Sequence, residues 1–228
     1  MQNSMEKRTA AVFGSTGLIG NLLLEELVLS EKYSLIKSFV RRPTGVTEQK
    51  VEEVVSDLTD LLSLSDSIVA DDLFVCLGTT IKKAGSVSNM EKIDRDLPVG
   101  IAEKAFANGV KNIAVVSSIG ASAKSANYYL RIKGEMEDRI MMIGFRSISI
   151  VRPSLLLGDR NEKRAGEKVS KVVMTVIGPL MAGSLKKYRA IHGGDVARAM
   201  ISLVLEGNGK RIIESDELQV IADKYGMN

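Results

Sequence analysis

Two side chains that could share a proton lie four residues apart, Tyr129 and Lys133. Residues at this spacing lie on one face of a helix and can reach each other. To act as an acid or base near neutrality, a phenol must have its pKa of about 10 lowered by about 3, which amounts to roughly 4 kcal/mol. An ammonium about 4 Å away supplies about 1 kcal/mol in water and about 4 kcal/mol at an effective dielectric near 20. Lys133 is therefore predicted to activate Tyr129 only in a pocket largely closed to solvent.

Two hydroxyls, Ser117 and Ser118, stand upstream of that pair at the end of the apolar run Ile113–Val116. A Tyr and a Lys at this spacing are common in helices, so the pair alone is a weak signal. With a serine at a strand end, the set suits proton transfer on a carbonyl or an alcohol, in which Ser118 hydrogen-bonds the reacting oxygen. We therefore predict Ser118, Tyr129 and Lys133 as the catalytic residues.

A glycine-rich turn near the amino terminus predicts the position of an anionic ligand. It follows the apolar run Ala10–Phe13 and precedes the helix-like run Asn21–Leu29. Glycine is needed where one residue takes positive φ, one lets the backbone approach a phosphate and one lets the helix touch the strand. The helix N-terminus then directs N–H groups at a dinucleotide pyrophosphate. The predicted binding residues are Gly14, Ser15, Thr16, Gly17, Leu18, Ile19 and Gly20, with the two hydroxyls as further donors.

The spacing of these glycines, G-x-x-G-x-x-G, is one residue longer than the usual dinucleotide fingerprint. The prediction therefore depends on the strand before the turn and the helix after it. A second signal follows the next strand-like run, Ser34–Val40, where an NAD site would place an acidic residue. This chain has Arg41 and Arg42 there, and guanidinium groups suit a 2′-phosphate. NADP(H) is predicted over NAD(H), and two solvated loop arginines are the alternative.

The elements that must position these residues alternate between strand and helix. Further strands are predicted at Val51–Ser56, Leu73–Leu77, Ile113–Val116 and Ser147–Val151, and further helices at Glu91–Asn108, with Gly109 as its cap, and at Tyr128–Ile143. This alternation predicts one α/β domain, a Rossmann-like, doubly wound parallel sheet with helices on both faces. Ligands are then expected at the carboxyl ends of the strands.

Composition limits the remaining function classes. The chain has 228 residues, a net charge of +3, 4% aromatic residues and no Trp, which argues against binding to nucleic acid. The single Cys76 lies in an apolar run and is expected to be a buried thiol rather than a nucleophile. His192 is the only histidine, so no zinc cluster and no other metal site is predicted, and we expect a structural loop role for it.

No signal-peptide pattern and no apolar segment of membrane-spanning length is found, so a soluble, cytoplasmic protein without an integral membrane segment is expected. The stretch Lys168–Arg189 holds an apolar run that Pro179 interrupts, flanked by basic residues. We interpret it as part of a small substrate or lid region at about 154–192. A surface for a protein partner or a membrane, and a buried helix without a role, are the alternatives.

Taken together, these motifs make a family recognisable. The chain resembles the short-chain dehydrogenase/reductase superfamily and, within it, the atypical group of Tat-interacting-protein-like NAD(P)H-binding proteins. The resemblance covers nearly the whole length. Five segments carry it: 12–20, Cys76–Leu77–Gly78–Thr79–Thr80, Ile93–Asp94–Arg95–Asp96, Tyr129–Leu130–Arg131–Ile132–Lys133–Gly134–Glu135, and 151–160.

The resemblance implies a cofactor contact at each strand end. The glycine turn would hold the pyrophosphate, and Arg41 with Arg42 would hold the adenosine phosphate. Asp57 and Leu58 would meet the adenine edge. The contacts implied for the nicotinamide half come from Leu77, Gly78 and Thr79, which would line the ribose and the bridge to nicotinamide, from Lys133, which would also bond the nicotinamide ribose, and from Pro153 beside the amide.

Two points stay open at this stage. Matching strand residues favours Ser118 as the catalytic serine, whereas a Ser-x-x-Gly pattern selects Ser117. Superfamily members often carry Asn in a proton relay on the helix after the fourth strand, and the matching residue here is Asp94. The resemblance therefore implies either an NADP(H)-dependent oxidoreductase acting on a small carbonyl or alcohol, or an NADPH-binding regulatory or interaction protein. An epimerase or dehydratase, a protein partner and any oligomeric state are left open.

Overall fold

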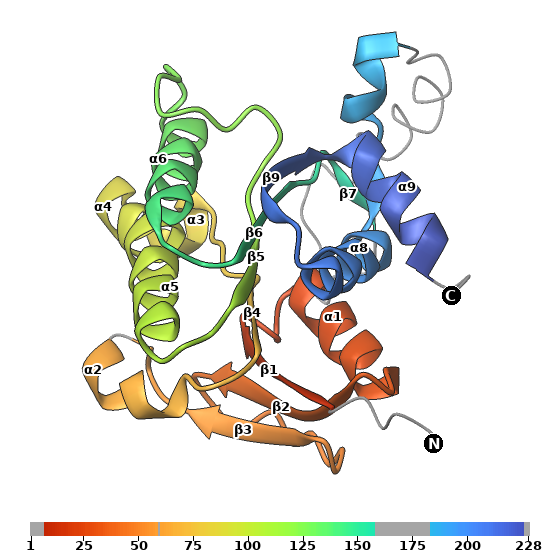
Figure 1. Ribbon diagram of the computed structural model, residues 1–228. Helices are drawn as coiled ribbons and strands as arrows, with labels where there is room; N and C mark the ends of the chain where they lie inside the picture. Colours follow the sequence, from red (N-terminus) through yellow and green to blue (C-terminus); the bar gives the residue numbers. More distant parts are fainter. Residues whose placement is uncertain (1–6, 59, 158–182, 226–228) are drawn as a thin grey trace.

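A computed structural model describes residues 7–58, 60–157 and 183–225 (Figure 1). In these residues, seven parallel strands form one sheet in the order β3-β2-β1-β4-β5-β6-β9. The strands are β1 (Arg8–Phe13), β2 (Tyr33–Val40), β3 (Val51–Val55), β4 (Asp72–Val75), β5 (Asn112–Val116), β6 (Ser147–Arg152) and β9 (Gly209–Glu214). The strand order reverses between β1 and β4, which is where a doubly wound sheet opens its ligand crevice. A separate pair, β7 (Leu156–Leu157) and β8 (Ile191–His192), is also parallel.

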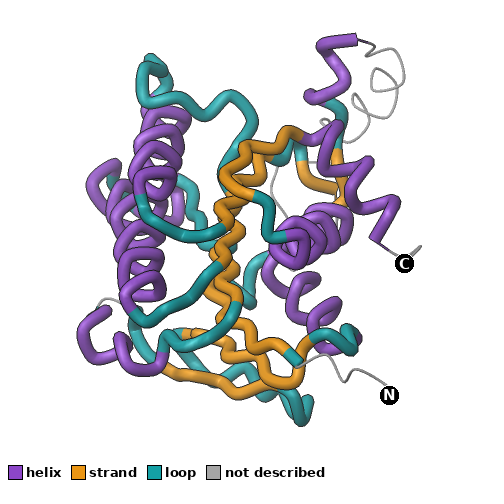
Figure 2. The backbone as a smooth tube through the Cα atoms, in the orientation of Figure 1, coloured by secondary structure: helices purple, strands orange, loops and turns teal. Residues whose placement is uncertain are grey.

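Helices cover both faces of the sheet, as Figures 1 and 2 show. On one face lie α2 (Leu61–Leu64), α3 (Ile81–Ala84), α4 (Val87–Glu91), α5 (Leu97–Ala107) and α6 (Tyr128–Met142), and on the other lie α1 (Leu18–Leu29), α8 (Gly193–Glu206) and α9 (Ser215–Tyr225). Shorter turns are Ser65–Ser67, the π-helical turn Lys92–Asp96 and the 3₁₀ turn Gly183–Tyr188. The predicted doubly wound α/β fold is confirmed.

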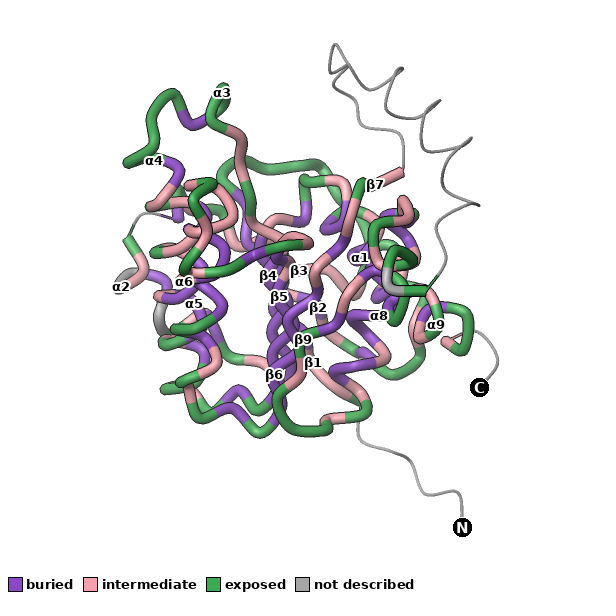
Figure 3. The backbone as a smooth tube through the Cα atoms, turned by 90° about the horizontal axis from the view of Figure 1, so that it is seen from above, coloured by how far each residue is buried: buried purple, intermediate pink, exposed green. Residues whose placement is uncertain are grey.

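Two apolar cores follow from this layering, one on each side of the sheet. Val12 packs with Leu23 and Val196 on the α1 and α8 side. Its neighbour Phe13 points the other way and stacks on Phe39 at 4.2 Å between ring centroids. Because side chains alternate across a strand, a sheet covered on both faces needs nearly continuous apolar strands. Figure 3 shows the central strands buried between exposed helix surfaces.

The long helix predicted at Glu91–Asn108 is interrupted in the structure. It consists of α4, the π-helical turn Lys92–Asp96 and α5, with Pro98 in the first turn of α5. Proline has no N–H to donate to the carbonyl four residues earlier, here that of Asp94, so the regular ladder fails there. The predicted cap at Gly109 is confirmed by its φ of +85°.

Strand β9 and helix α9 were not predicted from the sequence. β9 is an edge strand in which three of the six residues are exposed and Ile213 is the buried member. Edge strands often carry charged residues, so they lack the continuous apolar run by which the buried strands were predicted from the sequence. Among the described helices, none is long and apolar enough to cross a membrane.

Candidate functional site

The glycine turn after β1 has the geometry that its sequence predicts. Gly14 takes φ +86°, and a Cβ built there would lie 2.7 Å from the Cys76 carbonyl oxygen. A Cβ built on Gly20 would lie 2.1 Å from the Gly14 carbonyl oxygen, so α1 touches the turn only because residue 20 lacks a side chain. Gly17 is the N-cap of α1, without a side-chain cap or an acidic residue in the first turn. The helix N-terminus is thus suited to an anion.

The two hydroxyls of this turn lie in different environments. Ser15 is buried, and its Oγ accepts a hydrogen bond from Ser38 Oγ at 2.8 Å. Thr16 is exposed and lines a pocket of about 520 Å³. Of the two hydroxyls predicted as donors, Thr16 therefore faces the pocket, and Ser15 joins the turn to β2.

The same pocket is lined by Arg41, Arg42 and Asp57, each of which follows the end of a strand. Residues from three chain segments, all singled out from the sequence, thus meet at one place. Within the described ranges, neither arginine forms an ion pair, and both are exposed. The next residue, Leu58, is buried with φ +64°, a strained conformation for leucine. Such strain often marks binding sites, and here it shapes the chain beside Asp57.

Lys133 lies where the carboxyl ends of β4 and β5 meet the π-helical turn. Its side chain is 2% exposed, and its Nζ is 3.0 Å from Asp94 Oδ1 in an ion pair. The same Nζ is 3.5 Å from the carbonyl oxygens of Leu77 and Val116. Asp94 is fully buried, and its Oδ2 accepts a hydrogen bond from the Thr79 N–H at 3.0 Å. The π-helical turn thus directs a carboxylate at the predicted lysine, as such turns often do at functional sites.

Tyr129 lies one turn before Lys133, in the first turn of α6. The side chain of Asn127 caps this helix by accepting a hydrogen bond from the Tyr129 N–H at 3.0 Å. The ring is partly buried against a small apolar cluster formed by Ala84, Met90 and Ile132. Tyr129 and Lys133 therefore share α6, as their spacing predicts.

The structure separates the two serines at the end of β5. Ser117 is buried, and its Oγ donates a hydrogen bond to Glu137. Ser118 is partly exposed, and the contact of its Oγ is a long one, 3.5 Å to the Ile119 carbonyl oxygen. The Ser118 hydroxyl is thus only weakly engaged, whereas the Ser117 hydroxyl is part of the buried framework.

Glu137 is a site-supporting residue that the sequence reasoning missed. It accepts a hydrogen bond from Arg152 Nε at 2.9 Å and pairs with a second guanidinium nitrogen. This hydrogen bond and the charge of Glu137 raise the pKa of Arg152. Tyr129, Lys133 and Glu137 are spaced by four, so the continued helical spacing could have revealed it.

The comparisons with known proteins agree with this geometry. A family model described as NAD(P)H-binding matches residues 14–206. The chain belongs to the NAD(P)H-binding family. Its relatives support the atypical short-chain dehydrogenase/reductase group that the motifs indicate.

Two curated relatives illustrate this NAD(P)H-binding family. Protein HTATIP2 of Rattus norvegicus is 33% identical over 211 residues, which cover 90% of this chain and 85% of the relative. "Protein FMP52, mitochondrial" of Eremothecium gossypii is 30% identical over 213 residues, which cover 92% of this chain and 95% of the relative. Further fungal relatives, from Candida albicans and Emericella nidulans, carry the same mitochondrial name. The expected cytoplasmic location is therefore contradicted, and these names point to mitochondria instead.

Solved structures confirm the Rossmann-like fold of the family. MoeE5 in complex with UDP-glucose and NAD has a TM-score of 0.67 and 17% identity, covering 96% of this chain and 81% of that one. The Bordetella bronchiseptica enzyme WbmG in complex with NAD has a TM-score of 0.68 and 14% identity, covering 99% of this chain and 79% of that one. At these identities, the likeness concerns the fold alone.

The remaining predicted residues of this NAD(P)H-binding protein have varied surroundings. Cys76 is only partly buried, not fully buried as expected, but desolvation of the thiol raises its pKa to about 12, which supports a structural role. His192 is the N-cap of α8, and its Nδ1 accepts a hydrogen bond from the Gly194 N–H at 3.4 Å, as a structural residue would. No group of metal-ligating side chains occurs in the described part of the chain.

Pro153, predicted beside the nicotinamide amide, directly follows β6.

The predicted substrate or lid region at 154–192 lies largely outside the described residues, which omit 158–182. Its described ends are held to the main body. The Ser154 N–H donates a hydrogen bond to Ser215 Oγ at 2.7 Å, whereas the Ile191 N–H donates to the Leu155 carbonyl oxygen at 3.0 Å and so joins the two ends to each other. Lys187 pairs with Glu214 at 3.0 Å.

Proposed function

We propose that this NAD(P)H-binding protein is an NADP(H)-dependent oxidoreductase acting on a small carbonyl or alcohol substrate. The observation that carries the proposal is the pocket shared by Thr16, Arg41, Arg42 and Asp57, beside the N-terminus of α1. Two guanidinium groups without ion pairs in the described ranges offer charge-assisted hydrogen bonds to a 2′-phosphate. The resemblance assigns Asp57, which lines this pocket, and the adjacent Leu58 to the adenine edge.

The catalytic part of the proposal concerns α6 and the end of β5. A bound nicotinamide supplies or accepts the hydride. Ser118 holds the substrate oxygen through its available hydroxyl, and Tyr129 gives a proton to that oxygen or takes one from it. Lys133 keeps a positive charge near the site and contacts the carbonyl oxygens at the ends of β4 and β5. The burial of Lys133 supports a low effective dielectric around its ammonium group, whereas Tyr129 is only partly buried.

Cofactor preference is tested by titrating NADPH and NADH into the wild type and into Arg41→Ala and Arg42→Ala by calorimetry. A lost charge-assisted hydrogen bond should weaken NADPH binding about tenfold or more and leave NADH nearly unchanged. Arg211→Ala, on the edge strand β9, is the matched control. Equal wild-type affinities for the two nucleotides would contradict the NADP(H) assignment.

Turnover is tested with Tyr129→Phe and with the adjacent Tyr128→Phe as its matched control. A carbonyl-compound screen that follows NADPH absorbance should find a substrate for the wild type and for Tyr128→Phe. Tyr129→Phe should lose that turnover, by about a hundredfold or more, because proton transfer by a positioned group contributes that much. Its NADPH affinity should stay constant. Undiminished turnover in Tyr129→Phe would refute the catalytic role.

One observation favours the second candidate function, an NADPH-binding regulatory protein. Asp94 places a carboxylate 3.0 Å from Lys133 Nζ, and this negative charge offsets the positive charge that a phenolate at Tyr129 needs. In that case the screen finds no substrate, while NADPH changes the affinity of the protein for a partner. A pull-down that is identical with and without NADPH counts against this candidate.

A further inference from the structure

The buried pair of Asp94 and Lys133 joins three parts of the site. Asp94 comes from the π-helical turn and Lys133 from α6, and Asp94 also holds the Thr79 N–H in the loop after β4. Of the three acceptors around Lys133 Nζ, the Asp94 carboxylate is the nearest, at 3.0 Å against 3.5 Å for the two carbonyl oxygens. Asp94 is therefore the main contact that fixes the ammonium group.

The ion pair of Asp94 and Lys133 is covered by the backbone of Gly78, which has no side chain. A Cβ built on Gly78 would lie 3.4 Å from Asp94 Oδ1 and 3.9 Å from Lys133 Nζ, and Gly78 itself is exposed. Asp94 Oδ1 accepts no well-aligned hydrogen bond among the described residues, although it is buried and ion-paired. Buried polar atoms are nearly always satisfied, so this oxygen has capacity to spare beside an exposed stretch of chain.

We propose that Asp94 is a positioning residue for the nicotinamide half of the cofactor. It acts by fixing Lys133 and the Leu77–Thr79 loop in one arrangement before the cofactor arrives. This inference rests on the proposed cofactor site, because Lys133 and Thr79 are assigned to the nicotinamide half there. It adds a residue of opposite charge to a position where the resemblance leads one to expect a neutral amide. Preorganised partners lose less entropy on binding, so the effect should appear in cofactor affinity.

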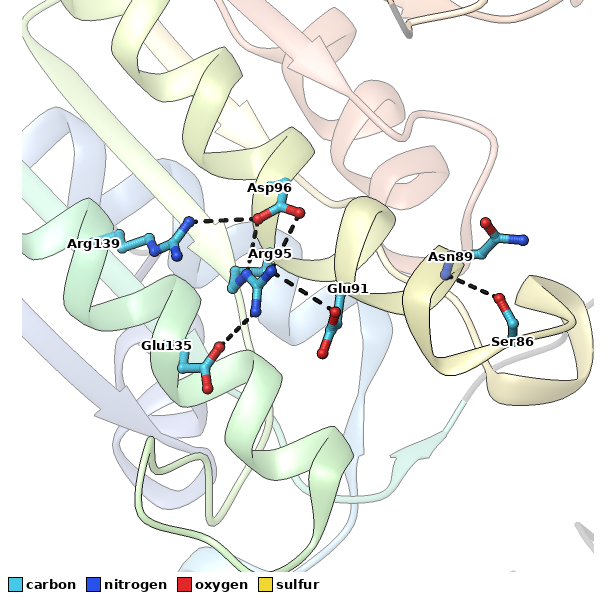
Figure 4. A network of polar contacts seen from close by, with 7 residues as sticks. All are labelled: Ser86, Asn89, Glu91, Arg95, Asp96, Glu135 and Arg139. Carbon is cyan, nitrogen blue, oxygen red and sulfur yellow. Dashed lines mark hydrogen bonds and ion pairs between the residues drawn. The ribbon is translucent and has the colours of Figure 1, made fainter.

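A second contact between the same two elements provides a matched control. Figure 4 shows Arg95, the neighbour of Asp94, pairing with Glu135 of α6 at 2.7 Å. This outer contact joins the π-helical turn to α6 without touching Lys133. Glu135→Gln therefore removes a carboxylate between the same elements, as Asp94→Asn does, but leaves the ammonium group in place.

The experiment compares NADPH with 2′,5′-ADP, which lacks the nicotinamide half, on the wild type, Asp94→Asn and Glu135→Gln. Asp94→Asn should weaken NADPH binding by about tenfold or more, the scale of one charge-assisted hydrogen bond, with 2′,5′-ADP changed by less than about twofold. Glu135→Gln should bind both ligands as the wild type does. Arg42→Ala should lose affinity for both ligands, which shows that 2′,5′-ADP reports the adenosine half.

Equal weakening of both ligands in Asp94→Asn, or no weakening of either, would overturn the positioning role. If Asp94→Asn does not fold, Asp94→Ser decides, since its shorter side chain removes the carboxylate contact with Lys133 and buries no larger amide. That variant should lose NADPH affinity and keep 2′,5′-ADP affinity, and unaltered NADPH affinity would contradict the inference. A wild type that binds neither NADPH nor NADH refutes the cofactor site itself. A wild type that prefers NADH refutes the NADP(H) assignment alone, and NADH with ADP then serves for the same comparison.

Discussion

Two buried aspartates at opposite ends of the same sheet are used in different ways. Asp72, at the amino end of β4, accepts hydrogen bonds from Arg8 Nε at 2.6 Å, Tyr33 Oη at 2.8 Å and Asn112 Nδ2 at 2.9 Å. Asp94, at the carboxyl end, has the Thr79 N–H and the Lys133 ammonium group. The first carboxylate is saturated by the protein, whereas the second keeps an oxygen without an aligned donor beneath Gly78.

This difference separates a structural edge of the sheet from a binding edge. Parallel sheets bind ligands at the carboxyl ends of their strands, so polar groups there must retain bonding capacity. Arg41, Arg42 and Ser118 share this property, because their polar atoms are exposed or only weakly engaged. At the amino ends, the buried Asn112 Oδ1 also lacks a hydrogen-bond partner among the described residues, so the contrast concerns the two carboxylates and not every buried polar atom. The predictions below test whether the two edges differ as stated.

The largest effect is expected from Asp72→Asn at the amino edge. Removing the charge from a buried pair typically costs about 3–5 kcal/mol, and the lower end applies because the Arg8 side chain keeps 30% of its surface exposed. We expect about 3 kcal/mol of lost unfolding free energy in urea denaturation. NADPH affinity should not change. The exposed Asp138→Asn is the control, and a loss of cofactor affinity in folded Asp72→Asn would break the distinction between the edges.

A smaller loss of stability, with loss of binding, is expected from Gly20→Ala at the glycine turn. The new methyl group meets the Gly14 carbonyl oxygen at 2.1 Å, so the backbone of the turn must shift. Overpacking of this kind costs about 1–3 kcal/mol, and the displaced α1 N-terminus should no longer bind the pyrophosphate. Calorimetry with NADPH and urea denaturation measure the two effects. Gly194→Ala, whose new Cβ would make only ordinary contacts from 3.6 Å at a glycine without positive φ, should keep full NADPH affinity.

How much of this could be predicted from the sequence depends on the range of the interactions. The roles of Gly14 and Gly20 follow from residues close in the chain, and the pocket of Arg41, Arg42 and Asp57 follows from parallel strands ending at one edge. The pairing of Asp94 with Lys133 could not be predicted, because it depends on a π-helical turn and on the packing of α6. The inward position of the Ser15 hydroxyl likewise depends on its partner on β2.

The stability of the protein at alkaline pH should show that Tyr33, at the amino edge of the sheet, is buried away from solvent. Burial, together with the negative charge of Asp72, raises the pKa of Tyr33 far above its ordinary value. Above about pH 10, the unfolded chain releases a proton that the native state keeps, so stability falls as pH rises, by about 1.4 kcal/mol per pH unit for this group. Tyr33→Phe should flatten the decline in urea denaturation between pH 10 and higher values. The exposed Tyr188→Phe should decline as the wild type does, and identical slopes in Tyr33→Phe and wild type would contradict the closed edge.

The smallest effect is expected from the charged cluster on the outer face of the π-helical turn (Figure 4). Arg95 pairs there with Asp96 at 2.8 Å and with Glu135 at 2.7 Å, and both acidic side chains are partly exposed. Exposed pairs contribute about 0–1 kcal/mol and are screened by salt, so Arg95→Gln should cost about 1 kcal/mol in low salt and less in 1 M NaCl. The buried pair of Asp94 and Lys133 is shielded from ions, so destabilisation by Asp94→Asn should persist at high salt. Equal salt dependence in the two variants would mean that solvent reaches the inner pair as freely as the outer one, which would remove the physical basis for a preorganised site.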